Sequence, residues 1–211
     1  MSAVRTGRGF ERLITFADAV VAIALTLLVL PLVDIAGQVR EGESVGRVLS
    51  DHHHEVSAFV ISFVVIWAVW RVHHRTMEYF DAYDATIMRL TMLWLFTIVV
   101  LPFTTELLNS EAYSHGAVPV YIAVLLVSAL SLFGMSLWGR RHRELLLADR
   151  AEVDDWVNEP RSLTTVGILV VALVLSIAVP RVGTLPLLAL LFTDAIDRAV
   201  LRLRARVRRH G

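Results

Sequence analysis

The sequence RLITFADAVVAIALTLLVLP, residues 12–31, decides how this chain folds. It places a cation, an aromatic ring and a carboxylate (Arg12, Phe16 and Asp18) at the start of an apolar run long enough to cross a bilayer. A carboxylate inside such a run is costly and marks a partner or a function. The stretch therefore predicts a first membrane-spanning helix whose beginning carries a functional polar group.

Apolar runs along the rest of the chain extend this interpretation. Of the 211 residues, 56% are hydrophobic, and the mean hydropathy is +0.63, whereas soluble domains are about 45–50% apolar. Because the excess falls in discrete runs, composition predicts an all-α polytopic membrane protein. The formal net charge is zero, which gives no reason to expect nucleic acid as a partner. The absence of cysteine excludes disulfides and thiolate metal sites.

Six runs are candidates for transmembrane helices, and together they predict one membrane domain over residues 1–211 that ends in a basic tail, residues 201–211. The expected spans are residues 14–32, 56–72, 87–108, 118–138, 163–179 and 182–200. The sixth is the weakest, because Gly183 and Pro186 interrupt its first turns and two aspartates follow its apolar part.

The arginines predict the orientation of these spans. With six spans, both termini lie on one side of the membrane, and that side receives 17 of the 20 basic residues. Only Arg40, Arg47 and Arg181 lie on the other side. Because basic residues accumulate in cytoplasmic loops, we expect a multi-pass protein of the cell membrane with both termini in the cytoplasm, where the basic tail contacts anionic membrane lipids.

Two other interpretations of local sequence are less favoured. A cleaved signal peptide would explain the basic residues before the first run, but the cleavage-like triplet Ala22-Ile23-Ala24 lies inside that run and not after it. The triplet His52-His53-His54 suggests a metal site. Three adjacent side chains cannot all point at one ion from regular structure, so we expect a solvated loop and no metal site.

Helical geometry divides the first span into faces. Its main apolar stripe, within about 40° of one line, consists of Phe16, Ala19, Ile23, Leu27 and Leu30. Thr26 lies about 60° to one side, Arg12 and Asp34 continue the stripe at its two ends, and Asp18 lies about 140° away, where other helices are expected. The stripe is either a helix-packing seam or the lining of a pore, with Asp34 at the outer mouth.

The second span brings polar side chains to the depth of Asp18. Because it runs back across the membrane, its end, residues 67–75, lies level with residues 12–18. Trp70, His73 and His74 fall there, and His74 follows Trp70 by one turn and can stack on it. We expect a buried polar network of these side chains with Arg12 and Asp18, in a structural or gating role.

The motifs of the first three spans resemble those of the transmembrane protein 175 family of potassium channels. Its R-x-x-x-F-S-D signature matches Arg12, Phe16 and Asp18, with Ala17 in place of serine. Its other motifs, A-I-x-x-T-L-L, W-x-x-H-H and L-P-F-[ST], match residues 22–28, 70–74 and 101–104. The order is that of the family, whereas the second half of the chain matches in hydropathy alone.

The resemblance implies a potassium-preferring cation channel of a bacterial membrane, a homotetramer of six-helix subunits without a cofactor. It implies that the first span lines the pore, with a hydrophobic constriction and gate at Ile23, Leu27 and Leu30 and a threonine layer at Thr26. It also implies a signature network that braces the inner end of the pore. The members of this network are Arg12, Phe16, Asp18, Trp70, His73 and His74.

The chain has neither the T-V-G-Y-G filter of ordinary potassium channels nor an arginine-rich voltage sensor, so we expect a passive, voltage-insensitive and moderately selective channel. A secondary transporter and a proton-permeable cation pathway remain alternatives, although no repeat relates the two halves. A membrane enzyme or haem protein is disfavoured, because all eight histidines lie in loops or at span ends and no nucleophile–base set appears. A structural or sensory role is a further alternative.

Overall fold

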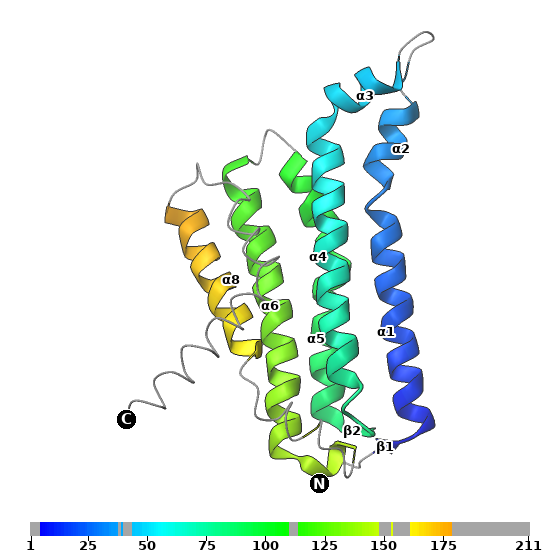
Figure 1. The fold of residues 1–211 in the computed structure, drawn as a ribbon, viewed down its shortest axis with the longest axis vertical. Coiled ribbons are helices and arrows are strands. Elements are labelled where there is room, and N and C mark those ends of the chain that lie inside the picture. The colour runs from blue at the N-terminus through cyan, green and yellow to red at the C-terminus, as the bar shows by residue number, and fades with distance from the viewer. Residues whose placement is uncertain are drawn as a thin grey trace, which may run out of the picture.

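The computed structural model describes residues 5–37, 39, 44–109, 114–147, 153 and 161–178, most of which form helices along one long axis (Figure 1). The helices are α1 (Arg8–Leu27), α2 (Leu30–Gly37), α3 (Val45–Asp51), α4 (His53–Met77), α5 (Ala85–Asn109), α6 (Ser114–Arg141), the 3₁₀ helix η2 (Arg143–Leu145) and α8 (Arg161–Ala178). The strands are β1 (Arg5–Thr6) and β2 (Ala82–Tyr83). The expected sixth span and the basic tail lie outside the described residues.

Four helical stretches are long and apolar enough to cross a membrane, and they coincide with the first four expected spans. They are Arg8–Gly37, His53–Met77, Ala85–Leu108 and Gly116–Arg141. Helix α8 coincides with the fifth expected span, but its apolar part, Thr165–Ala178, is shorter. The predicted all-α, multi-pass character is therefore confirmed for the described part of the chain, whereas six spans remain a prediction.

The first span differs from its prediction as one helix over residues 14–32, because α1 ends at Leu27 and α2 begins at Leu30. Pro31 has no N–H to donate to the carbonyl of Leu27, which breaks the helical ladder at this point. Beside it, the N–H of Val29 donates to the carbonyl of Thr26 over 3.3 Å, an i→i−3 bond. The following segment, expected as a loop over residues 33–55, contains the short helix α3.

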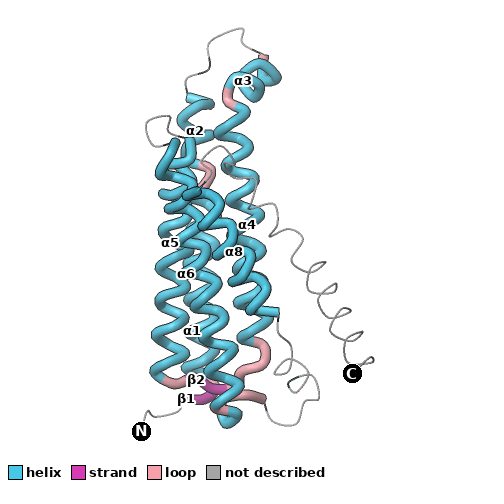
Figure 2. The backbone as a smooth tube through the Cα atoms, turned by 90° about the vertical axis from the view of Figure 1, so that its left-hand side faces the viewer, coloured by secondary structure: helices cyan, strands magenta, loops and turns pink. Residues whose placement is uncertain are grey.

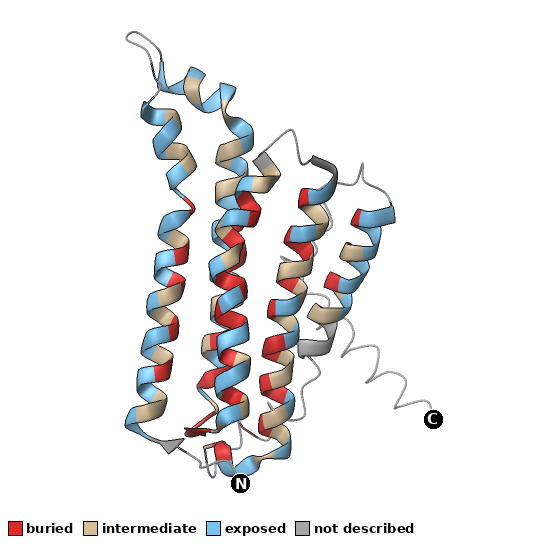
Figure 3. Cartoon of the chain, turned by 180° about the vertical axis from the view of Figure 1, so that it is seen from behind, coloured by how far each residue is buried: buried red, intermediate tan, exposed pale blue. Residues whose placement is uncertain are grey.

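Helix α5 lies at the centre of the bundle, packed against α1, α4 and α6, and α8 packs on the far side of α6 (Figures 1 and 2). Large side chains such as Trp94, Tyr121 and Ile66 are fully buried between these helices. Figure 3 shows the buried residues on the facing sides of the helices and exposed residues on their outer sides. Most of the exposed side chains on the spanning helices are apolar, as lipid or a second subunit requires.

One end of the bundle is tied together by short backbone pairings, and we call it the sheet end; the opposite end is the α3 end. Strand β1 pairs antiparallel with β2, which places the chain before α1 beside the α4–α5 connection. That connection also bridges to the segment after α6, through Phe80 with Leu146 and through a 3.0 Å bond from the N–H of Asp81 to the carbonyl of Leu145. Gly7, at φ +60°, makes the turn from β1 into α1.

Candidate functional site

Helix α1 has a buried face and an exposed apolar face. The buried side chains, which pack on the rest of the bundle, are Leu13, Ala17, Val21, Ala24 and, just after the helix, Leu28. On the other side the exposed fractions are 52% for Phe16, 59% for Ile23, 42% for Leu27 and 52% for Leu30. Figure 3 shows this division along α1. The Phe16–Leu30 stripe is therefore not the seam by which α1 packs on the other described helices.

The polar residues that accompany this stripe are also exposed. The hydroxyl of Thr26 donates to the carbonyl of Ile23 over 2.7 Å, which leaves its oxygen lone pairs able to accept from water or to face a cation. Arg12 lies at the sheet end of the stripe and Asp34, on α2, lies towards the α3 end. The stripe thus has an apolar middle, one hydroxyl beside it, and opposite charges at its two ends.

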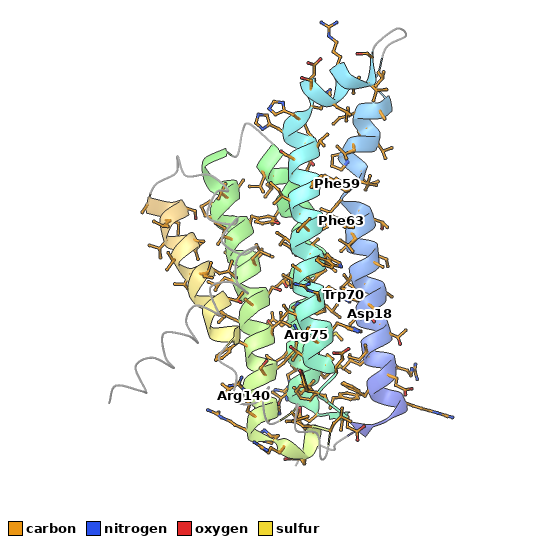
Figure 4. All side chains as sticks on the ribbon, viewed as in Figure 1. Asp18, Phe59, Phe63, Trp70, Arg75 and Arg140 are labelled. Carbon is orange, nitrogen blue, oxygen red and sulfur yellow. The ribbon has the colours of Figure 1, made fainter. Side chains whose placement is uncertain are left out.

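Asp18 leaves α1 on another face and contacts α4. The indole N–H of Trp70 donates to the Asp18 carboxylate over 2.8 Å, and Figure 4 labels the two residues at the same level of the adjacent helices. The ring of Trp70 stacks on that of His74, with centroids 5.2 Å apart and planes tilted by 32°. His74 in turn approaches Glu78, 3.7 Å from Nε2 to Oε1. A hydrogen bond to an ionised acceptor is stronger than a neutral one, so this contact fixes α1 against α4.

The expected network with Arg12 and His73 needs correction. Arg12 and Asp18 are six residues apart, about 120° around a helix, so their side chains leave α1 on different faces. His73 turns away from Asp18 towards α5, where it is 1% exposed and stacks flat on Trp94, with centroids 3.9 Å apart and planes 4° apart. Both ring nitrogens of His73 lack a hydrogen-bond partner among the described residues. The structure joins Asp18, Trp70 and His74, and it leaves His73 with Trp94.

Two polar clusters escaped the sequence reasoning. Towards the α3 end, the hydroxyl of Ser62 lies 2.8 Å from that of Thr105 and accepts from that of Tyr121 over 3.3 Å, joining α4, α5 and α6. At the sheet end, Asp84 accepts from the first backbone N–H groups of α5 and from Trp138 of α6 over 3.0 Å. In the sequence, each cluster is visible only as hydroxyl or carboxylate residues inside an apolar run or immediately before one. Which of these side chains contact each other is known only from the fold.

A small cavity lies beside the break between α1 and α2. Its volume is about 20 Å³, room for a single water molecule, and Pro31, Glu55, Phe59, Pro102 and Glu106 contribute to its lining. The described residues contain no group of three or more histidine or acidic side chains arranged to hold a metal ion. In the His52–His54 triplet, the ring centroids of His53 and His54 lie 4.1 Å apart, with the ring planes tilted by 37°.

Several known proteins are similar to this chain in sequence. Residues 12–102 match the family described as endosomal/lysosomal potassium channel TMEM175. "Potassium channel B446_29190" of Streptomyces collinus is 33% identical over 132 residues, which cover 60% of this chain and 62% of that protein. The human "Endosomal/lysosomal proton channel TMEM175" is 26% identical over 100 residues, which cover 46% of this chain and 19% of that protein. This chain thus spans less than two thirds of the length of these relatives.

A solved structure has the same fold over nearly the whole chain. It is the crystal structure of a lysosomal potassium-selective channel TMEM175 homolog from Chamaesiphon minutus. The TM-score is 0.66 at 24% sequence identity, and the match covers 93% of this chain and 98% of that one. The family indicated by the motifs is the one whose model matches residues 12–102, and these residues hold the Arg12–Asp18 signature and the Trp70–His74 motif.

Proposed function

We propose that this chain is the subunit of a potassium-preferring cation channel, passive and not voltage-gated, whose pore is lined by α1. The observation that carries the proposal is the continuous apolar stripe of α1, which stays exposed opposite the buried face of the same helix. The family match over α1, α4 and most of α5 and the relatives named as channels support it. The matched family consists of ion channels and not of enzymes.

The proposed assembly is a homotetramer of six-span subunits. In a closed cyclic assembly, each copy turns the same surface towards the axis, so one exposed stripe per subunit becomes a continuous lining. Four copies of Ile23, Leu27 and Leu30 would form three stacked apolar rings, with the hydroxyls of Thr26 beside them. Narrow apolar rings hold back ions by dewetting, which makes these rings the proposed constriction and gate.

The proposed orientation places the sheet end in the cytoplasm and Asp34 at the outer mouth of the pore. It rests on arginine, because basic residues accumulate on the cytoplasmic side. Most arginines of the described helices lie near the sheet end: Arg8, Arg12, Arg71, Arg75, Arg89, Arg140 and Arg141. The similarity to the potassium channel of Streptomyces collinus supports the plasma membrane of a bacterial cell as its location.

The role proposed for the signature residues is to hold the pore helix. The bond from Trp70 to Asp18, with His74 stacked beneath Trp70, anchors the middle of α1 on α4. The stacked pair His73 and Trp94 fixes α4 on α5. With the buried face of α1 held in this way, Arg12 and Phe16 are kept on the pore side.

A second candidate function is a proton-permeable pathway. The observation that favours it is the similarity to the human relative, which is named a proton channel. The two candidates share one fold and one pore, and they differ in the ion that crosses it. A secondary transporter is a third possibility that the same measurement separates.

The test is ion flux into liposomes that contain the purified full chain. We expect uptake driven by a potassium gradient alone, with a smaller uptake under the same sodium gradient. Flux equal to that of protein-free liposomes would contradict a channel of any kind. Uptake that requires a proton gradient would favour a transporter, and acidification of the lumen without potassium flux would favour the proton pathway.

A further inference from the structure

The outer face of α4 changes from apolar to basic towards the sheet end. Phe63, Val64 and Trp67 are exposed on this face, and Arg71 and Arg75 follow Trp67 at intervals of four residues. Residues four apart lie above one another on a helix, so Trp67, Arg71 and Arg75 form one column. We call these three residues the α4 basic column.

The two arginines of the column are available for an anion. The guanidinium carbon of Arg71 lies 4.9 Å from the centroid of the Trp67 ring, a cation–π contact that orients the guanidinium plane. Neither Arg71 nor Arg75 has a carboxylate partner among the described residues, and the acidic residue nearest in sequence, Glu78, approaches His74 instead. Figure 4 labels Arg75 on the lower part of α4, below Trp70.

The arginines of the column lie near the sheet end of α4, where its apolar run stops. Helix α4 has 25 residues, about 37 Å at 1.5 Å per residue, whereas the hydrocarbon layer is about 30 Å thick. The helix is therefore little more than one turn longer than the hydrocarbon layer, and Arg75, near its last residue, fits the part outside. Tryptophan is enriched at that boundary, and arginine on the polar side of it. Asp18 of α1 and Trp70 of α4 lie close to the same level.

We propose that the α4 basic column binds the headgroup of an anionic phospholipid in the leaflet at the sheet end. The phosphate lies against Arg71 and Arg75, since one guanidinium group can donate hydrogen bonds to two phosphate oxygens at once. An acyl chain lies along Trp67, Val64 and Phe63. A phospholipid satisfies both parts of this face, because it has an anion and a hydrocarbon chain joined end to end. A soluble anion would leave the apolar part uncovered.

The site is placed to influence the first helix. Trp70 lies between Trp67 and Arg71 in sequence and on the next face of α4, where it holds Asp18 of α1. A lipid on the column therefore fixes the same turn of α4 that anchors α1. This consequence for conduction rests on the proposed function, whereas the binding itself does not.

The test measures lipid binding to the purified, delipidated full chain by native mass spectrometry. Phosphatidylglycerol and phosphatidylcholine with identical acyl chains are the probes. We expect retention of phosphatidylglycerol over phosphatidylcholine by the wild-type chain. In Arg71→Gln/Arg75→Gln the preference for phosphatidylglycerol should fall roughly thirtyfold. Each basic residue near an anionic surface contributes about fivefold in affinity, and two residues are removed. Arg71→Lys/Arg75→Lys should keep part of the preference, since the charge stays and the planar fork is lost.

The matched control is Arg8→Gln/Arg141→Gln, which removes the same charge from exposed positions at the same end of other helices. It should keep most of the preference. Equal losses in the two glutamine variants would overturn the proposal in favour of general surface charge. Displacement of the lipid by millimolar inorganic phosphate would overturn it in favour of a soluble anion. Loss of the oligomer with unchanged lipid preference would assign the column to a contact between subunits.

These outcomes are independent of the channel proposal, because binding is read as mass and not as ion flux. A chain that fails to conduct but keeps the phosphatidylglycerol preference would leave the lipid site standing and remove the proposed function. Folding of each variant is checked by the α-helical circular dichroism of the same sample.

Discussion

The indole nitrogen of Trp70 and a carboxylate oxygen of Asp18 lie 2.8 Å apart, and their bond connects α4 to the face of α1 opposite the exposed stripe. Asp18 is half-buried in a stretch that is otherwise apolar. The carboxylate therefore needs the hydrogen bond from Trp70 to remain charged at this depth, since an unpaired charge in an apolar environment is costly. The contact explains why a carboxylate belongs in the first membrane helix without requiring that it meet the ion.

We expect Asp18→Asn and Trp70→Phe to destabilise the chain by similar amounts and the double variant to cost little more than either. Hydrogen bonds to charged groups contribute about 1.5–3 kcal/mol, and that energy should appear as coupling between the two sites. The measurement is a double-mutant cycle on unfolding in detergent. Strictly additive losses would show that the two side chains act separately. Ion selectivity of the folded Asp18→Asn protein should be unchanged; altered selectivity would place Asp18 in the pore.

The sequence was sufficient to predict the two faces of α1, because each residue turns the side-chain direction by 100° around a helix. The same rule placed Asp18 away from the stripe and put Trp70 and His74 within stacking distance. It also placed Arg12 and Asp18 on different faces, and the network that joined them was expected only because the two residues share a depth. Depth alone does not bring side chains together when they leave the helix on different faces.

Contacts between distant segments were not predictable in the same way. The turn of His73 towards Trp94 depends on how α4 rotates against α5, which no periodicity in either helix specifies. The pairing of β1 with β2 involves two residues on each side, too few for any alternating pattern. Proline interrupts a helical ladder, but membrane helices tolerate it when neighbours satisfy the freed groups, so the effect of Pro31 is decided by tertiary structure.

The sheet end offers a prediction about Gly139. A Cβ atom added at Gly139 would lie 2.6 Å from the ring of Phe80, which is itself 3% exposed and held by its bridge to Leu146. Gly139→Ala should therefore destabilise the chain by about 1–3 kcal/mol through overpacking. Gly167→Ala in α8 is the control, because nothing lies within 4 Å of its added Cβ. Thermal unfolding in detergent should show a lower midpoint for the first variant only; equal midpoints would mean that Phe80 moves freely.

The buried hydroxyls at the α3 end lead to a prediction in which a second substitution restores stability lost through a first. Ser62→Ala removes the partner of Tyr121, whose side chain is fully buried, and should cost about 1–3 kcal/mol for the orphaned hydroxyl. The loss of Ser62 affects Thr105 less, since the Thr105 hydroxyl keeps its hydrogen bond to the carbonyl of Leu101 over 2.9 Å. Adding Tyr121→Phe to Ser62→Ala should restore part of the loss. The midpoint of thermal unfolding is the readout, and a double variant worse than both single variants would argue against the network.

Asp34 predicts a dependence of conductance on salt. If it lies at the outer mouth, its charge raises the local cation concentration over a Debye length, about 30 Å at 0.01 M salt and 3 Å at 1 M. Asp34→Asn should lower single-channel conductance at low salt and leave it unchanged at high salt. Asp51→Asn, an exposed carboxylate of α3, is the control and should have a smaller effect. A conductance loss that is the same at every salt concentration would place Asp34 away from the mouth.

The last prediction concerns the constriction. Ile23 and Leu27 are exposed on a face that the other described residues leave uncovered, so a polar side chain there costs little folding energy in the single subunit. In the assembled pore, Ile23→Ser or Leu27→Ser should wet the apolar rings. A tenfold rise in conductance would correspond to a barrier lowered by about 1.4 kcal/mol. Discrimination between potassium and sodium should weaken in parallel.

Controls separate the pore face from the other faces of the protein. Val170→Ser changes an equally exposed apolar residue on the distant helix α8 and should leave current and selectivity as they are. Leu25→Ser and Leu28→Ser, on other faces of the first span, should reduce stability without raising conductance, because Leu28 is 3% exposed and packs in the core. If serine at Ile23, Leu27 and Leu30 leaves the current of folded protein unchanged, the stripe is a contact between subunits and the ions cross elsewhere.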